Sequence, residues 1–184
     1  MPPKILYIGG VKSGKSRLAE RRALTLAEAE DPLRPPFYLA TTDPADRSMQ
    51  GRIQRHRQER GHTFVTIEEP RDLLNALKTI AQDYHLPAGQ GVILIDCLTL
   101  WLSNCLLQTL APDSLETYLD QTIAALLEAP HSLIFVINDV GSGIHADTEL
   151  GRRFTDLSGL IAQQIAAGCT EVYHCIAGIG TRIK

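Results

Sequence analysis

The sequence predicts an α/β fold, with a mostly parallel sheet that is covered by helices on both faces. Short, continuously apolar segments of strand length, such as residues 4–9 and 91–96, alternate with longer segments of helical pattern. Strands of a parallel sheet are buried on both faces, so they are apolar throughout instead of at every second position. No internal repeat or linker interrupts the alternation, and we expect the 184 residues to form a single domain, 1–184.

Prolines and apolar runs place the elements in order. A strand is expected over 4–9 and a helix over 16–29, which the proline-rich segment 31–36 ends. Strands over 37–41 and 63–68 flank a polar helix over 46–60, and Pro70 opens a helix to residue 84. Pro112 divides the helical sequence after strand 91–96 into one helix to about residue 110 and another over 113–129. Strand 132–138, helix 147–167 and strand 171–177 complete the pattern.

Composition excludes several classes of protein. The formal net charge of −3 gives no general electrostatic attraction for nucleic acid or for an acidic membrane surface. The longest apolar stretch, 92–107, is interrupted by polar residues, so we expect no membrane span and a cytoplasmic protein. The four cysteines form no C-x-x-C pair and stand in apolar sequence, which favours buried reduced thiols over a disulfide or a metal site.

A phosphate-binding loop follows the first predicted strand. The stretch Gly9-x-x-x-x-Gly14-Lys15-Ser16 matches the Walker A pattern between a strand and a helix. Glycines allow backbone N–H groups to surround phosphate oxygens, the lysine supplies a positive charge for the β- and γ-phosphates, and the serine hydroxyl can bind Mg²⁺. A chance glycine-rich turn is the alternative, which the strand–loop–helix context disfavours. The predicted fold class is therefore an α/β P-loop NTPase of the RecA-like type.

Two other strands end in polar residues that would face the same crevice. Asp96 ends an apolar strand of the Walker B form, where its carboxylate would hold Mg²⁺ directly or through water. The alternative is that Asp96 caps the following helix. Residues 138–143, N-D-V-G-S-G, end another strand, and their glycines could equally mark a simple turn.

A basic segment carries a single histidine. On a helix, Arg52, His56, Glu59 and Arg60 would share one face. Such a charged helix is usually only a solvated surface, and no aromatic residues interleave the arginines as nucleic-acid binding would favour. The functional alternative is that His56 attacks phosphorus as a neutral imidazole, while the arginines keep its charge low and neutralise phosphate oxygens.

These motifs together resemble the bifunctional adenosylcobinamide kinase/adenosylcobinamide-phosphate guanylyltransferases of cobalamin biosynthesis. The resemblance is carried by G-G-V-K-S-G-K-S, A-T-T at 40–42, R-I-Q-R-H at 52–56, I-D-C-L-T at 95–99, N-D-V-G-S-G-I at 138–144, R-R-F-T-D-L-S-G at 152–159 and the closing A-G-I-G-T-R-I-K. It covers essentially the whole chain in order. The chain differs from the family's usual pattern at Arg55, Asp139, 145–148 and Ala162.

The resemblance implies two reactions. The first phosphorylates the aminopropanol hydroxyl of adenosylcobinamide with GTP or ATP, and the second moves GMP from GTP to His56 and then to adenosylcobinamide phosphate. It also implies Mg²⁺ bound by Ser16 and Asp96, Lys15 and His56 as catalytic residues, and a homotrimer. The residues it implies for nucleotide binding are Gly9, Gly10, Val11, Lys12, Ser13, Gly14, Lys15, Ser16, Ala40, Thr41, Thr42, Arg57, Gln58, Glu59, Arg60, Glu68 and Asp96.

Three other functions use part of the same motifs. A GTP-binding regulatory switch would ordinarily carry a base-specificity motif of the N-K-x-D type, which the sequence lacks. A single-function small-molecule kinase would use the phosphate loop and Asp96 but not His56. A nucleotide-binding module without catalysis would need only the loop.

Overall fold

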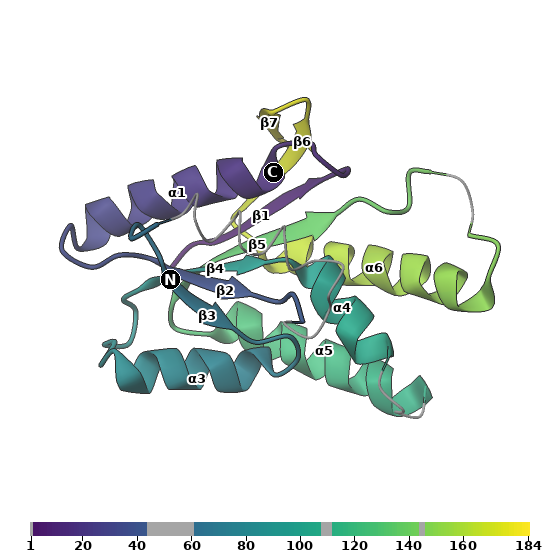
Figure 1. Cartoon of the computed structure of the whole chain (residues 1–184), viewed down its shortest axis with the longest axis horizontal. Helices are drawn as coiled ribbons and strands as arrows, with labels where there is room; N and C mark the ends of the chain where they lie inside the picture. The colour runs from purple at the N-terminus through teal and green to yellow at the C-terminus, as the bar shows by residue number, and fades with distance from the viewer. Residues whose placement is uncertain (1, 44–60, 108–111, 144–145) are drawn as a thin grey trace.

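The computed structural model describes residues 2–43, 61–107, 112–143 and 146–184 as one seven-stranded sheet with helices on both faces (Figure 1). The strand order is β3-β2-β4-β5-β1-β6-β7, in which every pair is parallel except β6 and β7. In chain order the elements are β1 Lys4–Gly9, α1 Lys15–Glu30, β2 Phe37–Ala40, β3 Val65–Glu68, α3 Leu73–Asp83, β4 Val92–Asp96, α4 Leu98–Leu106, α5 Pro112–Glu128, β5 Ser132–Asn138, α6 Glu149–Gly168, β6 Glu171–Ile176 and β7 Ile179–Arg182.

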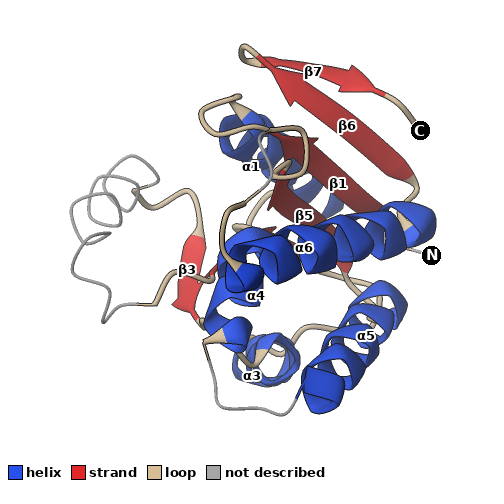
Figure 2. Cartoon of the chain, turned by 90° about the vertical axis from the view of Figure 1, so that its right-hand side faces the viewer, coloured by secondary structure: helices blue, strands red, loops and turns tan. Residues whose placement is uncertain are grey.

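The two faces of the sheet are covered unequally. Helix α1 lies on one face, and helices α3, α4, α5 and α6 lie on the other (Figure 2). Alternate side chains of each strand point to opposite faces, as Ile93 and Leu94 in β4 do, so strands β1, β2, β4, β5 and β6 contribute to both hydrophobic cores. The α1 side is packed closely because the helix presents the small residues Ala19, Ala23 and Ala27 to the strands.

The predicted mostly parallel α/β sheet is confirmed. Strand β5 lies between β1 and β4, so the strand that leads into the phosphate loop and the strand that ends in Asp96 are not neighbours. The strand order itself was not predicted from the sequence. The predicted helix over 46–60 lies outside the described residues. None of the helices in the described part of the chain is both long and apolar enough to cross a bilayer.

Two elements differ from the predictions. Helix α3 begins at Leu73, three residues after Pro70, because the Asp72 carboxylate accepts a hydrogen bond from the Asn75 N–H and so caps the helix. The chain also forms a further strand, β7, which turns back antiparallel to β6 through residues 177 and 178. All four cysteines are free and buried, as predicted.

Candidate functional site

The phosphate loop, residues 9–16, connects β1 to α1 and lies tightly against β6. An ideal Cβ on Gly9 would lie 2.3 Å from the carbonyl oxygen of Cys175 in β6. Gly14 has a φ of 90° and would place a Cβ 2.8 Å from the Cα of Gly178, in the turn between β6 and β7. Both positions therefore require glycine, whereas a Cβ on Gly10 would meet open space. The shape of the loop is fixed on one side by the C-terminal strands.

Lys15 is the first residue of α1, at the positive end of the helix dipole. Its side chain is only 7% exposed, and its Nζ donates a hydrogen bond to the Gly10 carbonyl at 3.0 Å. The ammonium group thus lies across the loop itself, where triphosphate oxygens would compete for it. The Ser13 hydroxyl is buried without a hydrogen-bond partner among the described residues, so the loop also holds an unused polar group.

Three residues predicted from sequence lie in one row across neighbouring strands. Ala40 ends β2 and pairs with Glu68 of β3 on one side and with Asp96 of β4 on the other. Thr41 and Thr42 follow directly, and the Thr41 side chain is fully buried. The carboxyl ends of parallel strands meet at the edge where the phosphate loop also lies, because Gly9 ends β1. The structure thus brings these predicted residues to the loop's edge of the sheet.

Asp96 does not cap the helix that follows it. Helix α4 starts at Leu98, its N-cap residue is Cys97, and no side chain caps it. The Asp96 carboxylate instead accepts a hydrogen bond at 2.7 Å from the hydroxyl of Tyr38 in β2. The capping alternative is therefore wrong, and the carboxylate stays at the carboxyl end of the sheet.

The end of β5 also adjoins the phosphate loop. Asn138 pairs with Gly9, and the Asp139 N–H donates to the Gly9 carbonyl at 3.0 Å. The Asp139 carboxylate accepts a hydrogen bond from the Ser142 hydroxyl at 2.6 Å. The segment predicted to end a strand beside the ligand crevice is thus fixed to the first glycine of the loop.

The pKa of the buried Cys97 thiol is raised, and the charges of Asp96 and Lys15 both act on it. Burial raises the pKa of Cys97 to about 12, and the neighbouring Asp96 carboxylate raises it further. The Lys15 ammonium opposes these effects. A thiol with so high a pKa stays protonated near neutral pH, so Cys97 is not a thiolate nucleophile there.

The oxygen donors fit a hard divalent cation such as magnesium. The Ser16 hydroxyl and the Asp96 carboxylate are hard oxygen ligands, and Mg²⁺ in nucleotide sites takes one or two protein oxygens with phosphate and water. Within the described ranges, no three His, Cys, Asp or Glu residues gather as a closed metal site would require. The donor chemistry thus suits a metal that arrives with a nucleotide.

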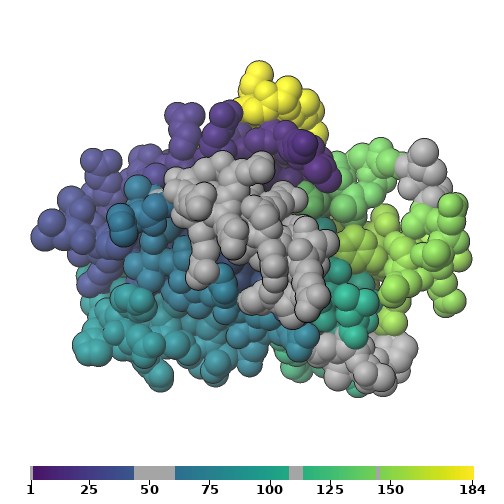
Figure 3. All heavy atoms as spheres, viewed as in Figure 1, coloured from purple at the N-terminus to yellow at the C-terminus, as the bar shows by residue number. Residues whose placement is uncertain are grey.

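Two contributors to the site were missed in the sequence. One is the β6–β7 hairpin, whose Gly178 N–H donates to the Ser13 carbonyl at 2.8 Å. The C-terminal strands lie beside the N-terminal segment that carries the loop (Figure 3). The φ values of 51° and 82° at Ala177 and Gly178 suit a tight hairpin turn, but alanine is not a usual residue at its first position, so only Gly178 signals the turn in the sequence. The other is Tyr38, whose partner lies on a strand far away in sequence.

His56, Arg57, Gln58, Glu59 and Arg60 lie outside the described residues. Their predicted roles remain predictions.

Comparison with known proteins gives full-length relatives. The chain is 39% identical to the bifunctional adenosylcobalamin biosynthesis protein CobP of Pseudomonas aeruginosa, over 97% of this chain and 96% of that one. It is 32% identical to the bifunctional adenosylcobalamin biosynthesis protein CobU of Escherichia coli K12, over 98% and 99% of the two chains. Among solved structures, a KaiC-like protein of Pyrococcus horikoshii OT3 matches with a TM-score of 0.48 and 13% identity, over 94% of this chain and 70% of that one.

A family model agrees with these relatives. The model for cobinamide kinase / cobinamide phosphate guanyltransferase matches residues 5–183, which include every strand except the first residue of β1. The match thus spans both the loop and the hairpin behind it. The chain belongs to the cobinamide kinase / cobinamide phosphate guanyltransferase family.

Proposed function

We propose that this chain uses one phosphate loop for two successive transfers in cobalamin biosynthesis. As a member of its family it is a bifunctional kinase and guanylyltransferase that uses nucleotides. In the proposed sequence, adenosylcobinamide is first phosphorylated and adenosylcobinamide phosphate then receives GMP, which gives adenosylcobinamide-GDP. The observation that carries the proposal is the loop itself, with Lys15 buried at the start of α1 and Asp96 held at the same edge of the sheet.

The kinase step needs a positioned triphosphate and a neutralised γ-phosphoryl group. The loop N–H groups and the α1 N-terminus bind the phosphates, and Lys15 moves from the Gly10 carbonyl to the β- and γ-phosphate oxygens. The substrate hydroxyl oxygen attacks the γ-phosphorus, the bond to the β–γ bridging oxygen breaks, and the hydroxyl proton leaves to solvent. Ser16 and Asp96 would hold Mg²⁺, which neutralises phosphate charge when bound.

The guanylyl step uses the α-phosphorus of GTP. A ring nitrogen of His56 attacks it, the bond to the bridging oxygen breaks, and pyrophosphate leaves. A phosphate oxygen of adenosylcobinamide phosphate then attacks the same phosphorus, the P–N bond breaks, and His56 is restored. Arg57 and Arg60 would neutralise phosphate oxygens, and Gln58, Glu59, Glu68 and residues 40–42 would line the nucleotide. The phosphoramidate conserves the transfer potential between the two acceptors.

The proposal also covers the domain organisation, the oligomeric state, the location in the cell and the phosphoryl donor. We infer that residues 1–184 act as a single domain, which the continuous sheet supports. We also infer a cytoplasmic homotrimer that binds neither nucleic acid nor membrane, with ATP or GTP as the phosphoryl donor of the kinase step. A phosphate loop contacts the phosphates and not the base of a nucleotide. The phosphoryl donor is therefore identified by comparing the rate of the kinase step with ATP and with GTP.

Labelling separates this proposal from its rivals. The protein is incubated with Mg²⁺ and GTP labelled at the α-phosphate, and label bound to the chain is tested for the acid lability and base stability of a phosphoramidate. Wild-type protein and a His85→Ala control, which removes an exposed histidine on another part of the chain, should both carry the label, and His56→Ala should not. Absence of label on the wild type, or its persistence in His56→Ala, overturns the guanylyl-histidine.

A second measurement tests the kinase half. Lys15→Ala should lose phosphorylation of adenosylcobinamide by about a hundredfold or more, because its charge acts on the transferred phosphoryl group. Unchanged turnover would remove Lys15 from the reaction. A regulatory switch would instead hydrolyse GTP slowly without passing phosphate to adenosylcobinamide, and a single-function kinase would phosphorylate it without becoming labelled.

A further inference from the structure

The hydroxyl of Tyr38 donates a hydrogen bond to the Asp96 carboxylate. The donor oxygen lies 2.7 Å from Asp96 Oδ2, at the usual distance of an O–H···O hydrogen bond. Tyr38 stands in β2 and Asp96 ends the neighbouring strand β4, so the bond crosses between strands at their carboxyl ends. One carboxylate oxygen is thereby engaged by the protein.

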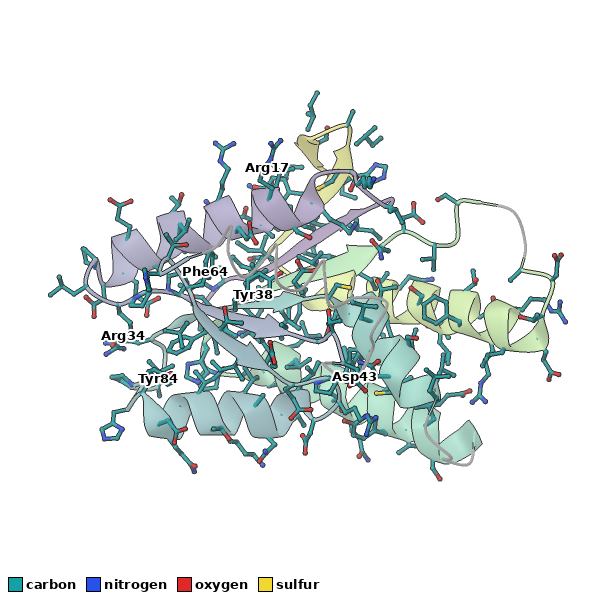
Figure 4. All side chains as sticks on the ribbon, viewed as in Figure 1. Arg17, Arg34, Tyr38, Asp43, Phe64 and Tyr84 are labelled. Carbon is teal, nitrogen blue, oxygen red and sulfur yellow. The ribbon has the colours of Figure 1, made fainter. Side chains whose placement is uncertain are left out.

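The tyrosine is rigidly held. Its side chain is 5% exposed, on the α1 side of the sheet, and the Phe64 ring packs edge-on against it with centroids 5.8 Å apart. Both rings are labelled in Figure 4, between α1 and the strands. A buried ring has little rotamer freedom, so the position of its hydroxyl is fixed by the core and not by solvent.

The backbone of Asp96 is fixed from the same strand segment. Thr41, just after β2, donates its N–H to the Asp96 carbonyl at 3.2 Å. The main chain of Asp96 and one oxygen of its carboxylate are therefore both held from the β2 side. A terminal carboxylate torsion is otherwise broad, so the tyrosine bond is what selects its orientation.

We propose that Tyr38 is the positioning residue of the magnesium site: it holds Asp96 Oδ2 so that Oδ1 is presented to the metal. The inference rests on the proposed role of Asp96 as a magnesium ligand. Carboxylates that bind metals are commonly held by a second hydrogen bond of this kind, and its loss typically costs tenfold to a hundredfold in metal affinity. In this role Tyr38 acts through Asp96.

The chain offers a closely matched control. The Tyr173 hydroxyl donates to Glu171 Oε2 at 2.6 Å, so it is also a tyrosine–carboxylate bond on this sheet. It lies within β6 and involves no predicted site residue. Tyr173→Phe therefore removes the same chemistry without touching Asp96, and any loss common to both variants reflects only a missing hydroxyl.

The test measures metal affinity directly. Mn²⁺ binding to the protein with GDP is followed by electron paramagnetic resonance of free Mn²⁺, for wild type, Tyr38→Phe, Tyr173→Phe and Asp96→Asn. We expect the Mn²⁺ dissociation constant to rise about tenfold in Tyr38→Phe and to stay unchanged in Tyr173→Phe. GDP affinity without metal should be unchanged in Tyr38→Phe, and circular dichroism should show that it folds. An unchanged Mn²⁺ dissociation constant in Tyr38→Phe overturns the inference.

Asp96→Asn separates this inference from the function on which it rests. If that variant binds Mn²⁺ as the wild type does, the magnesium role of Asp96 is wrong. If it weakens binding and Tyr38→Phe does not, only the positioning role fails. In the double variant, Tyr38→Phe should add no further loss to that of Asp96→Asn, because the tyrosine works through the carboxylate. Two independent, additive losses would contradict the proposal.

Discussion

Thr41 and Cys97 are joined by two hydrogen bonds through a single hydroxyl. The Thr41 Oγ1 accepts from the Cys97 N–H at 2.8 Å and donates to the Cys97 carbonyl at 2.7 Å. Asn104 of α4 in turn donates to the Thr41 carbonyl at 2.8 Å. Because Cys97 directly follows Asp96, this arrangement fixes the turn that leads from the end of β4 into α4.

Removal of the Thr41 hydroxyl should destabilise the protein, although it changes the shape of the side chain very little. Thr41→Val keeps the shape of the side chain but leaves the buried Cys97 N–H without its partner, while the Cys97 carbonyl keeps the N–H of Trp101 at 3.1 Å. We expect the free energy of unfolding to fall by about 2–3 kcal/mol, as measured by urea denaturation. Thr41→Ser is the control, since it retains the hydroxyl and should lose only about 1 kcal/mol for the methyl group. Equal losses in the two variants would contradict the role of the bonds.

The two glycines that begin the phosphate loop should differ in how much stability the protein loses when each is replaced by alanine. In Gly9→Ala the new Cβ would meet the Cys175 carbonyl oxygen, which belongs to the backbone of the adjacent strand and cannot rotate away. We expect a loss of roughly 3 kcal/mol or more in the free energy of unfolding. Gly10→Ala meets open space and should stay within about 0.5 kcal/mol of wild type. Thermal and urea denaturation of both variants would measure these changes. Similar losses of unfolding free energy in the two variants would contradict the close contact of Gly9 with β6.

The sequence allowed the core of the fold to be predicted because buried parallel strands have a strong signal. Strands β1, β4 and β5 are continuous apolar runs, and the residues that end them form the polar edge of the sheet. Strand β7 was not predicted because Ile179–Arg182 is short and mostly exposed, so it lacks an apolar run. It forms because the turn before it reverses the chain onto β6.

Contacts between distant segments explain what could not be predicted of the site. Residues of the phosphate loop were identified because the chemistry of phosphate binding demands glycine, lysine and serine at fixed spacing. In the sequence, Tyr38 has the pattern of an ordinary core residue of a strand. Only the pairing of β2 with β4 brings its hydroxyl to Asp96. The same is true of Gly178, which lies far from Ser13 in the sequence and next to it in the fold.

The β6–β7 turn should affect nucleotide binding although it lies outside the phosphate loop. Gly178 and Gly89 both have positive φ, 82° and 86°, so alanine at either position costs about 1 kcal/mol of backbone strain. Only Gly178 contacts the loop, through its N–H to the Ser13 carbonyl. We therefore expect Gly178→Ala to weaken GDP binding several-fold, as measured by calorimetry, and Gly89→Ala to leave it unchanged. Equal GDP affinity in the two variants would show that the turn does not shape the loop.

Cys105 should make the protein less stable in alkaline solution. Burial raises the pKa of this thiol from 9.0 to about 12, a rise that the Arg71 charge only partly opposes, and its residue is 2% exposed. In the unfolded chain the thiol loses its proton first, so above about pH 9 the unfolded state binds fewer protons and stability falls as pH rises. One such thiol contributes a slope of up to about 1.4 kcal/mol per pH unit. Cys105→Ala should therefore show a shallower decline in the free energy of unfolding between about pH 9 and 11.

Leu102→Ala is the control, because Leu102 is a fully buried neighbour on α4. This variant should lower the free energy of unfolding at every pH and leave its slope against pH unchanged. A slope in Cys105→Ala equal to that of wild type would mean that this thiol ionises as readily in the folded protein as in the unfolded chain.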